Sequence, residues 1–226
     1  MLLIIIIMAI TGAGCQPRPF LKPEVPEASQ ILDVKGDLIA AVSQENRIPV
    51  PLEDVSIYLR EAIVAVEDAR FYQNRGIEPA GLARAQYRNI QAGRIVEGGS
   101  TITQQLAKNL YLDPGRTIGR KLEEVVLAVQ LERKYTKDEI LEMYLNQIYF
   151  GEGAYGVEAA ARLYFNKPAK DLGLAESAML AGIPRAPSLY NPVRSMEAAK
   201  ARQATVLSRM EELGLISPEE ARTAGE

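Results

Sequence analysis

The chain of 226 residues is long enough to bury one hydrophobic core, and a content of 47% hydrophobic and 24% charged residues is typical of folded proteins. Its net charge of −3 argues against general nucleic-acid binding, so any anion-binding site must be local. The sequence contains no His, which excludes His-based triads and His metal sites and leaves Glu, Asp, Lys and Tyr for acid–base chemistry.

The first residues form an apolar run that is about half of the roughly 20 residues needed to span a bilayer. We interpret residues 1–15 as the end of a transmembrane or signal anchor, although no Lys or Arg precedes the run and a buried strand is the alternative. Four prolines in residues 16–29 favour an extended linker. Lipid attachment at Cys15 is disfavoured, because Gly12 stands where a larger aliphatic residue is expected.

Residues 30–226 are predicted to form one mainly α-helical domain that opens with a short β-hairpin. Two apolar runs, 31–34 and 38–42, flank a turn that contains Gly36. Periodicity, capping residues and helix-ending glycines predict helices over approximately residues 52–68, 79–93, 100–109, 117–134, 136–146, 155–165, 174–181 and 196–213, with one more from 217. The expected N-caps include Ser100, Thr117 and Thr136, and the expected C-terminal glycines are Gly182 and Gly214.

The helix that follows Ser100 carries a polar face beside its apolar one. Thr101, Gln105 and Lys108 lie at spacings i, i+4 and i+7, which places them on one side. A solvated surface is the ordinary interpretation of such a stripe. The preceding Gly98-Gly99 allows a close backbone approach, and short polar side chains are good fixed donors, so the pattern favours a ligand-binding face.

The helix that follows Thr117 has cations where helices usually carry acids. Arg120 and Lys121 lie in its first turns, at the positive end of the helix dipole, where a cation is mildly unfavourable. Cations beside unpaired N–H groups form an anion site, most naturally for phosphate. Glu124 and the small Ala128 share a face with Lys121. A surface pair between Arg120 and Glu124 is the alternative.

The acidic pair Glu67-Asp68 ends a helix whose preceding residues are apolar. A carboxylate at an apolar edge has a raised pKa, so it can act as an acid or base near neutral pH. Taken alone, this dipeptide could equally be an ordinary exposed acidic pair.

Together these stretches resemble glycosyltransferase family 51, the peptidoglycan glycosyltransferases, and the resemblance covers nearly all of the chain beyond residue 29. The motifs that carry it are Glu67-Asp68-x-x-Phe71…Gly76; Gly99-Ser100-Thr101-Ile102-Thr103-Gln104-Gln105-Leu106-x-Lys108-Asn109; Arg120-Lys121-x-x-Glu124-x-x-x-Ala128-x-x-Leu131-Glu132; Ile140-Leu141-Glu142-x-Tyr144-Leu145-Asn146…Gly151; and Ala161…Tyr164-Phe165-Asn166-Lys167, followed by Pro187-x-x-Tyr190-Asn191-Pro192. The second and third motifs are long and specific.

The resemblance implies a lysozyme-like helical head with a smaller, apolar, membrane-facing jaw near residues 91–97. It implies an enzyme that polymerises lipid II into glycan strands, inverts C1 of MurNAc and releases undecaprenyl pyrophosphate. The implied setting is the outer face of the bacterial cytoplasmic membrane. The implied partners are lipid II, the growing glycan chain, the membrane and other cell-wall synthesis proteins, with no nucleic acid.

The resemblance also implies roles for individual residues. Glu67 is the general base, and Glu124 assists at the donor side, directly or through a divalent cation such as Mg²⁺; no cofactor is essential and no metal site is predicted. The implied substrate-binding residues are Lys108, Arg120 and Lys121 for the pyrophosphate, Thr101 and Gln105 for donor sugar and phosphate, and also Asp68, Phe71, Ser100 and Asn109.

One departure from the family pattern is Asn74, which stands where the family usually has His. Asn donates hydrogen bonds but does not titrate, so we expect a preserved fold with reduced activity. The chain has no Ser-x-x-Lys motif of the penicillin-binding transpeptidases, yet its hairpin and its last helices favour an N-terminal part of a class A penicillin-binding protein over a monofunctional enzyme. A lysozyme-like muramidase or lytic transglycosylase and a non-catalytic membrane scaffold are the competing interpretations.

Overall fold

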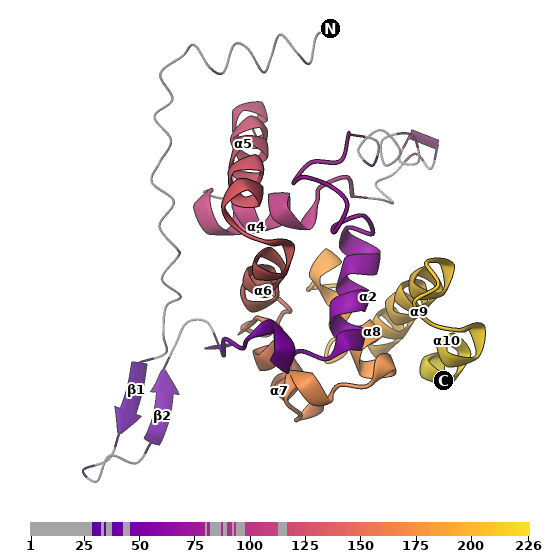
Figure 1. Cartoon of the computed structure of the whole chain (residues 1–226). Helices are drawn as coiled ribbons and strands as arrows, with labels where there is room; N and C mark the ends of the chain where they lie inside the picture. Colours follow the sequence, from indigo (N-terminus) through magenta and orange to yellow (C-terminus); the bar gives the residue numbers. More distant parts are fainter. Residues whose placement is uncertain are drawn as a thin grey trace, which may run out of the picture.

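The structure is a computed structural model that describes residues 29–32, 34, 38–42, 46–79, 81, 87, 90–91, 93, 98–112 and 117–226. Within this part the chain is mainly helical, as predicted (Figure 1). Its helices are α2 Ile57–Glu67, α4 Ile102–Tyr111, α5 Ile118–Lys134, α6 Lys137–Gln147, α7 Val157–Phe165, α8 Leu174–Gly182, α9 Met196–Glu212 and α10 Pro218–Gly225, with 3-10 turns η1 Leu52–Asp54, η2 Ala169–Asp171 and η3 Ile183–Arg185.

The predicted hairpin forms from β1 (Ser29–Leu32) and β2 (Leu38–Val42), which pair antiparallel with an irregularity between Ile31 and Leu32. It lies apart from the helices in Figure 1. A second, two-residue pairing was not predicted: β3 (Asn46–Arg47) runs parallel to β4 (Ala154–Tyr155). Arg47 reinforces it by donating to the carbonyl of Asn146 at 2.8 Å.

Most helix boundaries follow from local capping chemistry. Thr117 and Thr136 cap α5 and α6 as predicted, and Thr136 shares a capping box with Glu139. Gly214, at φ +70°, follows the end of α9 in the left-handed conformation that favours glycine. Gly182 is different, because its φ of −76° is helical and the chain continues from it into η3.

The expected cap Ser100 is wrong by one residue. The N-cap of α4 is Thr101, whose hydroxyl accepts from the backbone N–H of Gln104 while the Gln104 side chain accepts from the backbone N–H of Thr101. This reciprocal pair requires a residue with a long polar side chain three positions after the cap, and Gln104 stands in that position for Thr101.

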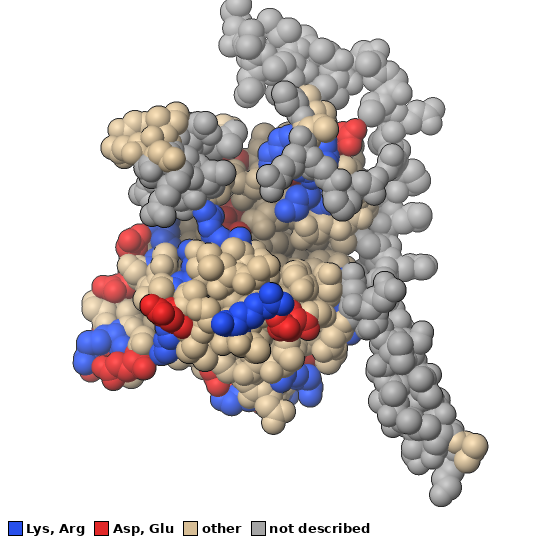
Figure 2. Space-filling model, turned by 180° about the vertical axis from the view of Figure 1, so that it is seen from behind, with Lys and Arg blue, Asp and Glu red and all other residues tan. Residues whose placement is uncertain are grey.

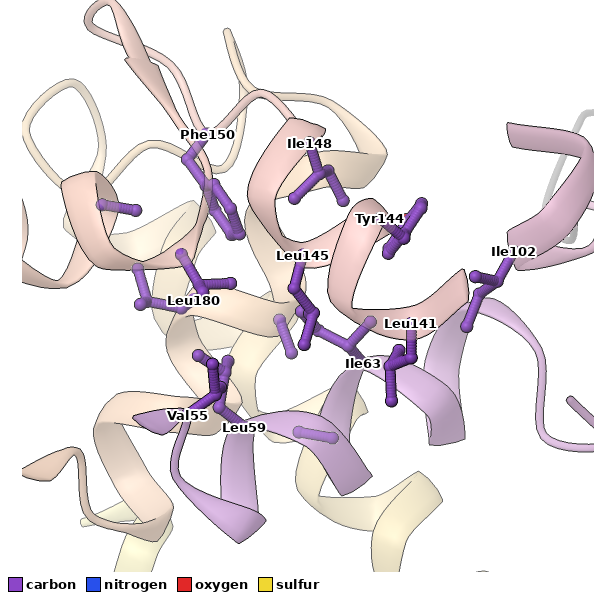
Figure 3. Close-up of a cluster of buried hydrophobic side chains, with 14 of the residues drawn as sticks. Val55, Leu59, Ile63, Ile102, Leu141, Tyr144, Leu145, Ile148, Phe150 and Leu180 are labelled. Atoms are coloured by element: carbon purple, nitrogen blue, oxygen red, sulfur yellow. The ribbon is translucent and has the colours of Figure 1, made fainter. Parts of the chain in front are cut away.

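The core lies where apolar side chains of α2, α6 and α8 meet, and Figure 3 shows Leu59 and Ile63 of α2 beside Leu141 and Leu145 of α6. These four side chains are fully buried, and each buried Leu or Ile contributes about 1.5–3 kcal/mol. Helix α2 packs against α8 and α9, whereas α4 packs against α5 and α6. The helices thus form two groups, α2 with α8 and α9, and α4 with α5 and α6.

Several expectations fall outside the described residues. These are the anchor over 1–15, nearly all of the linker over 16–29, most of the helix over 79–93 and most of the jaw region over 91–97. No helix in the described ranges is long and apolar enough to cross a bilayer.

Candidate active site

Glu67, the last residue of α2, is half-buried, and its carboxylate faces α4. Nε2 of Gln105 donates a 2.7 Å hydrogen bond to Oε2 of Glu67. Oε1 of Gln105 in turn accepts a 3.2 Å bond from the hydroxyl of Tyr144 on α6. Two residues predicted to belong to one site, Glu67 and Gln105, are therefore in direct contact, and three helices fix their geometry.

Asp68 is buried and turns toward the structure's interior. Its two oxygens accept from Nδ2 of Asn74 at 3.0 and 2.9 Å, and Oδ2 also accepts from the backbone N–H of Ile102 at 3.2 Å. The carboxylate thus lies at the positive N-terminus of α4, where an acid is stabilised. Burial raises the pKa of Asp68, while the hydrogen bonds from Asn74 and Ile102 act in the opposite sense.

Two other predicted substrate-binding residues, Phe71 and Thr101, are buried in the described structure. Phe71 is fully buried, and its ring packs beneath the ammonium of Lys137 at 4.4 Å from the ring centroid. Thr101 is 3% exposed, and its hydroxyl, besides capping α4, donates to the carbonyl of Gly76 at 2.7 Å. These contacts leave both side chains with little surface for a ligand.

The predicted group of Lys121 and Glu124 on α5 is present. Nζ of Lys121 forms an ion pair with Glu124 and donates a 2.8 Å bond to Oγ of Ser100. Glu124 is only 2% exposed, whereas the Lys121 side chain is 43% exposed and faces solvent. The alternative prediction, a surface pair of Arg120 with Glu124, is wrong: in the described part of the chain Glu124 pairs with Lys121.

The remaining predicted cations lie on the same two helices. Lys108 and Asn109 are exposed on α4, and Arg120 on α5 is half-buried. Nε of Arg120 is buried without a hydrogen-bond partner in the described part of the molecule. Lys and Arg side chains gather around a hollow in the upper half of the view in Figure 2. Among the described residues, no carboxylate forms an ion pair with Lys108 or Arg120.

The sequence reasoning missed Arg202, a cation near Glu67, and Arg185, which neighbours Arg202. Arg202 of α9 is largely buried; burial and the neighbouring Arg185 lower its pKa, while the charges of Glu67 and Tyr190 raise it. Nη1 of Arg185 also lies 3.5 Å from the position that a Cβ on Gly98 would occupy. The only sequence signal was the position of Arg185 two residues before a family stretch that begins at Pro187.

A divalent cation does not fit the residues around Glu124. Its carboxylate already pairs with the ammonium of Lys121, which repels a second cation. No group of three His, Cys, Asp or Glu side chains in the described ranges could hold a metal ion. We therefore assign no step to a metal at this site.

This arrangement joins one acid, oriented by an amide, to cations that a leaving anion can approach. A mainly helical fold with such a site fits an enzyme that uses a carboxylate base and stabilises an anionic leaving group.

Comparison with known proteins identifies the family. The family model described as Transglycosylase matches residues 35–211. Penicillin-binding protein 1F of Bacillus subtilis is 52% identical over 197 residues, covering 87% of this chain and 28% of the relative. Penicillin-binding protein 1A of Escherichia coli is 44% identical over 212 residues, covering 89% and 25%. The chain belongs to the transglycosylase family: it is a peptidoglycan glycosyltransferase domain of the kind found in class A penicillin-binding proteins.

A solved structure agrees with this assignment. The 2.6 Å crystal structure of penicillin-binding protein 1A from Haemophilus influenzae aligns with 90% of this chain at a TM-score of 0.52 and 31% identity. The alignment covers 21% of that protein. The chain therefore spans about a quarter of the length of the relatives to which it is similar.

Proposed function

We propose that the chain polymerises lipid II into glycan strands, with inversion at C1 of the donor MurNAc and release of undecaprenyl pyrophosphate. The observation that carries the proposal is the contact of residues 100–105 with both halves of the site. Gln105 holds the carboxylate of Glu67, and Ser100, at the other end of this segment, accepts from Lys121. A short, capped stretch of backbone thus joins the acid to the cations.

Glu67 acts as the general base in this reaction. The 4-hydroxyl oxygen of the acceptor GlcNAc attacks C1 of MurNAc, a C1–O bond forms, and the hydroxyl proton passes to Glu67. One carboxylate oxygen, Oε2, is held by Gln105, while Oε1 accepts no hydrogen bond from any described residue and can take the proton. The amide keeps the carboxylate aimed while this proton moves.

The cations stabilise the group that leaves. As the bond from C1 to the phosphate oxygen breaks, its electron pair remains on undecaprenyl pyrophosphate, whose negative charge requires nearby donors. Lys121, Lys108 and Arg120 present such donors from α4 and α5. Asn109 adds an exposed amide one residue after Lys108.

Glu124 supports the donor side by orienting Lys121. The carboxylate is buried, so its charge is balanced chiefly by the ammonium of Lys121. The hydroxyl of Ser100 accepts a second hydrogen bond from this ammonium and helps to hold it in place. Because Lys121 remains 43% exposed, it can contact a phosphate without leaving Glu124.

The proposed substrate sets the location. Lipid II is anchored in a bilayer, so the site must work at the outer face of the bacterial cytoplasmic membrane, with the growing glycan chain beside it. The same location would bring the domain into reach of other cell-wall synthesis proteins.

The test is polymerisation of purified lipid II by the wild type and by Glu67→Gln, with a phosphoglycolipid inhibitor as control. We expect glycan strands from the wild type, a loss of at least about 100-fold in Glu67→Gln, and inhibition by the phosphoglycolipid. Incubation with finished peptidoglycan provides the contrast. Release of muropeptides without polymer growth would identify a lytic enzyme and refute the proposal.

A further inference from the structure

Two side chains on one face of α6 each contact a primary amide. Lys137 and Tyr144 are seven residues apart, which places them two turns apart on the same side of the helix. Nζ of Lys137 donates to Oδ1 of Asn74 at 3.2 Å, and the hydroxyl of Tyr144 donates to Oε1 of Gln105 at 3.2 Å.

The NH₂ group of each amide donates a hydrogen bond to one member of the acidic pair. Nδ2 of Asn74 bonds both oxygens of Asp68, and Nε2 of Gln105 bonds Glu67. Helix α6 is thereby connected to Glu67 and Asp68 through two parallel hydrogen-bond chains, although neither Lys137 nor Tyr144 bonds Glu67 or Asp68 directly in the described structure.

The orientation of an amide is decided by its neighbours, because its oxygen and NH₂ ends have nearly the same shape. The ammonium of Lys137 can only donate hydrogen bonds, so the amide of Asn74 must turn its oxygen toward Lys137. Tyr144 is fully buried, and burial followed by the charges of Glu67 and Asp68 raises its pKa well above the usual range, which keeps its hydroxyl protonated as a donor.

Lys137 is itself fixed in place. Its Nζ donates to Glu132 at 2.7 Å and lies over the buried ring of Phe71. Thr103 of α4 holds the same oxygen of Glu132 at 2.5 Å. Only 19% of the Lys137 side chain is exposed, so this ammonium is held by the interior rather than by solvent.

We propose that Lys137 and Tyr144 are positioning residues: they orient the amides of Asn74 and Gln105, and these amides fix Asp68 and Glu67 for glycosyl transfer. This proposal rests on the proposed role of Glu67 as general base. It assigns to α6, which carries no reacting group, the task of setting the direction of the catalytic carboxylate.

The first test is Tyr144→Phe, which keeps the ring and removes only the hydroxyl. We expect kcat for lipid II polymerisation to fall about 10-fold with KM nearly unchanged, because the base is misaligned while the substrate contacts remain. In a Gln105→Ala background the same change should have no further effect on kcat, since the amide that it orients is gone. The matched control is Tyr164→Phe, which removes a hydroxyl bonded to the carbonyl of Phe150 and should retain wild-type kcat.

The second test compares Lys137→Met with Lys137→Arg. Lys137→Met removes the donors and should lower kcat about 10-fold, whereas Lys137→Arg keeps donors and should restore most of it. Combined with Asn74→Ala, Lys137→Met should cause no additional loss of kcat. Thermal unfolding of each variant shows that the measured enzyme is folded.

Glu67→Gln, measured in parallel, distinguishes a failure of Glu67 as general base from a failure of Lys137 and Tyr144 as positioning residues. If Glu67→Gln remains active, the role of Glu67 as base fails and the positioning proposal fails with it. If Glu67→Gln is inactive but Tyr144→Phe and Lys137→Met match Tyr164→Phe in kcat, the positioning proposal alone is overturned. Losses that simply add to those of Gln105→Ala and Asn74→Ala would also overturn it.

Discussion

Oδ2 of Asp68 accepts a 3.2 Å hydrogen bond from the backbone N–H of Ile102, the first residue of α4. The second acid of the family motif thus anchors the helix that carries Gln105, while the first acid, Glu67, receives the Gln105 amide. The two neighbouring carboxylates therefore have different roles: Asp68 stabilises the scaffold, and Glu67 lies in the candidate active site.

Asp68→Asn should change how stability depends on pH. Because burial raises the folded pKa of Asp68 above its usual 3.8, the folded protein retains this proton in a range where the unfolded chain has released it. The contribution of Asp68 to the free energy of unfolding therefore falls as the pH rises from about 3.8 through the folded pKa. Thermal unfolding between about pH 3 and pH 7 should show the wild-type Tm declining relative to that of Asp68→Asn, then running parallel to it. If the wild-type Tm instead rises relative to that of the variant as the pH increases, the hydrogen bonds to Asp68 affect its pKa more than burial does.

Lys121→Met should reduce both stability and anion binding. It leaves Glu124 buried without its cation, and we expect a loss of about 1–2 kcal/mol, less than for a fully buried pair because the Lys121 side chain is 43% exposed to screening solvent. The double variant Lys121→Met/Glu124→Leu removes both charges and should recover stability in urea unfolding without recovering polymerisation. Recovery of activity in the double variant would show that the Lys121 charge is not needed for the leaving group.

Gly76→Ala should be strongly destabilising. Gly76 has φ +85°, and an added Cβ would lie 2.9 Å from Cγ of Glu132 and 3.1 Å from the carbonyl oxygen of Ala128. We expect a loss of about 2–4 kcal/mol in the free energy of unfolding, from strain and overpacking together. Gly214→Ala is the control, because its φ is +70° with open space around it, and it should lose only about 1 kcal/mol. Equal losses in the two variants would exclude the steric contribution.

Asn74→His tests whether the family's usual residue improves this enzyme. The Asn74 amide already donates to Asp68 and accepts from Lys137 and from the backbone N–H of Gly76. A neutral imidazole offers one donor for Asp68 and one acceptor for Lys137, so we expect polymerisation by Asn74→His to stay within about twofold of the wild type, a difference below about 0.5 kcal/mol. A large gain would instead support the reduced activity that the sequence alone predicts. Circular dichroism and thermal unfolding serve as the controls for folding.

Local chemistry made much of the fold predictable. The N-caps Thr117 and Thr136 need partners only three residues away, so the sequence determines them directly. The helical repeat likewise places Lys121 and Glu124 on one face, but it does not decide whether Lys121 or Arg120 pairs with Glu124. Where two adjacent hydroxyls could cap α4, the sequence did not decide between them: Gln104 selects Thr101, and Lys121 engages Ser100.

Contacts between distant segments were decided only by the tertiary structure. The sequence by itself determined the helical class, the family motifs and the presence of an acid and cations in one chain. Which donor reaches which carboxylate depends on how α2, α4, α6 and α9 pack, because a hydrogen bond requires its two atoms to lie within about 3 Å. The packing lets Gln105 donate a hydrogen bond to Glu67 and lets Ile102 and Asn74 donate to Asp68. It also places Arg202 near Glu67.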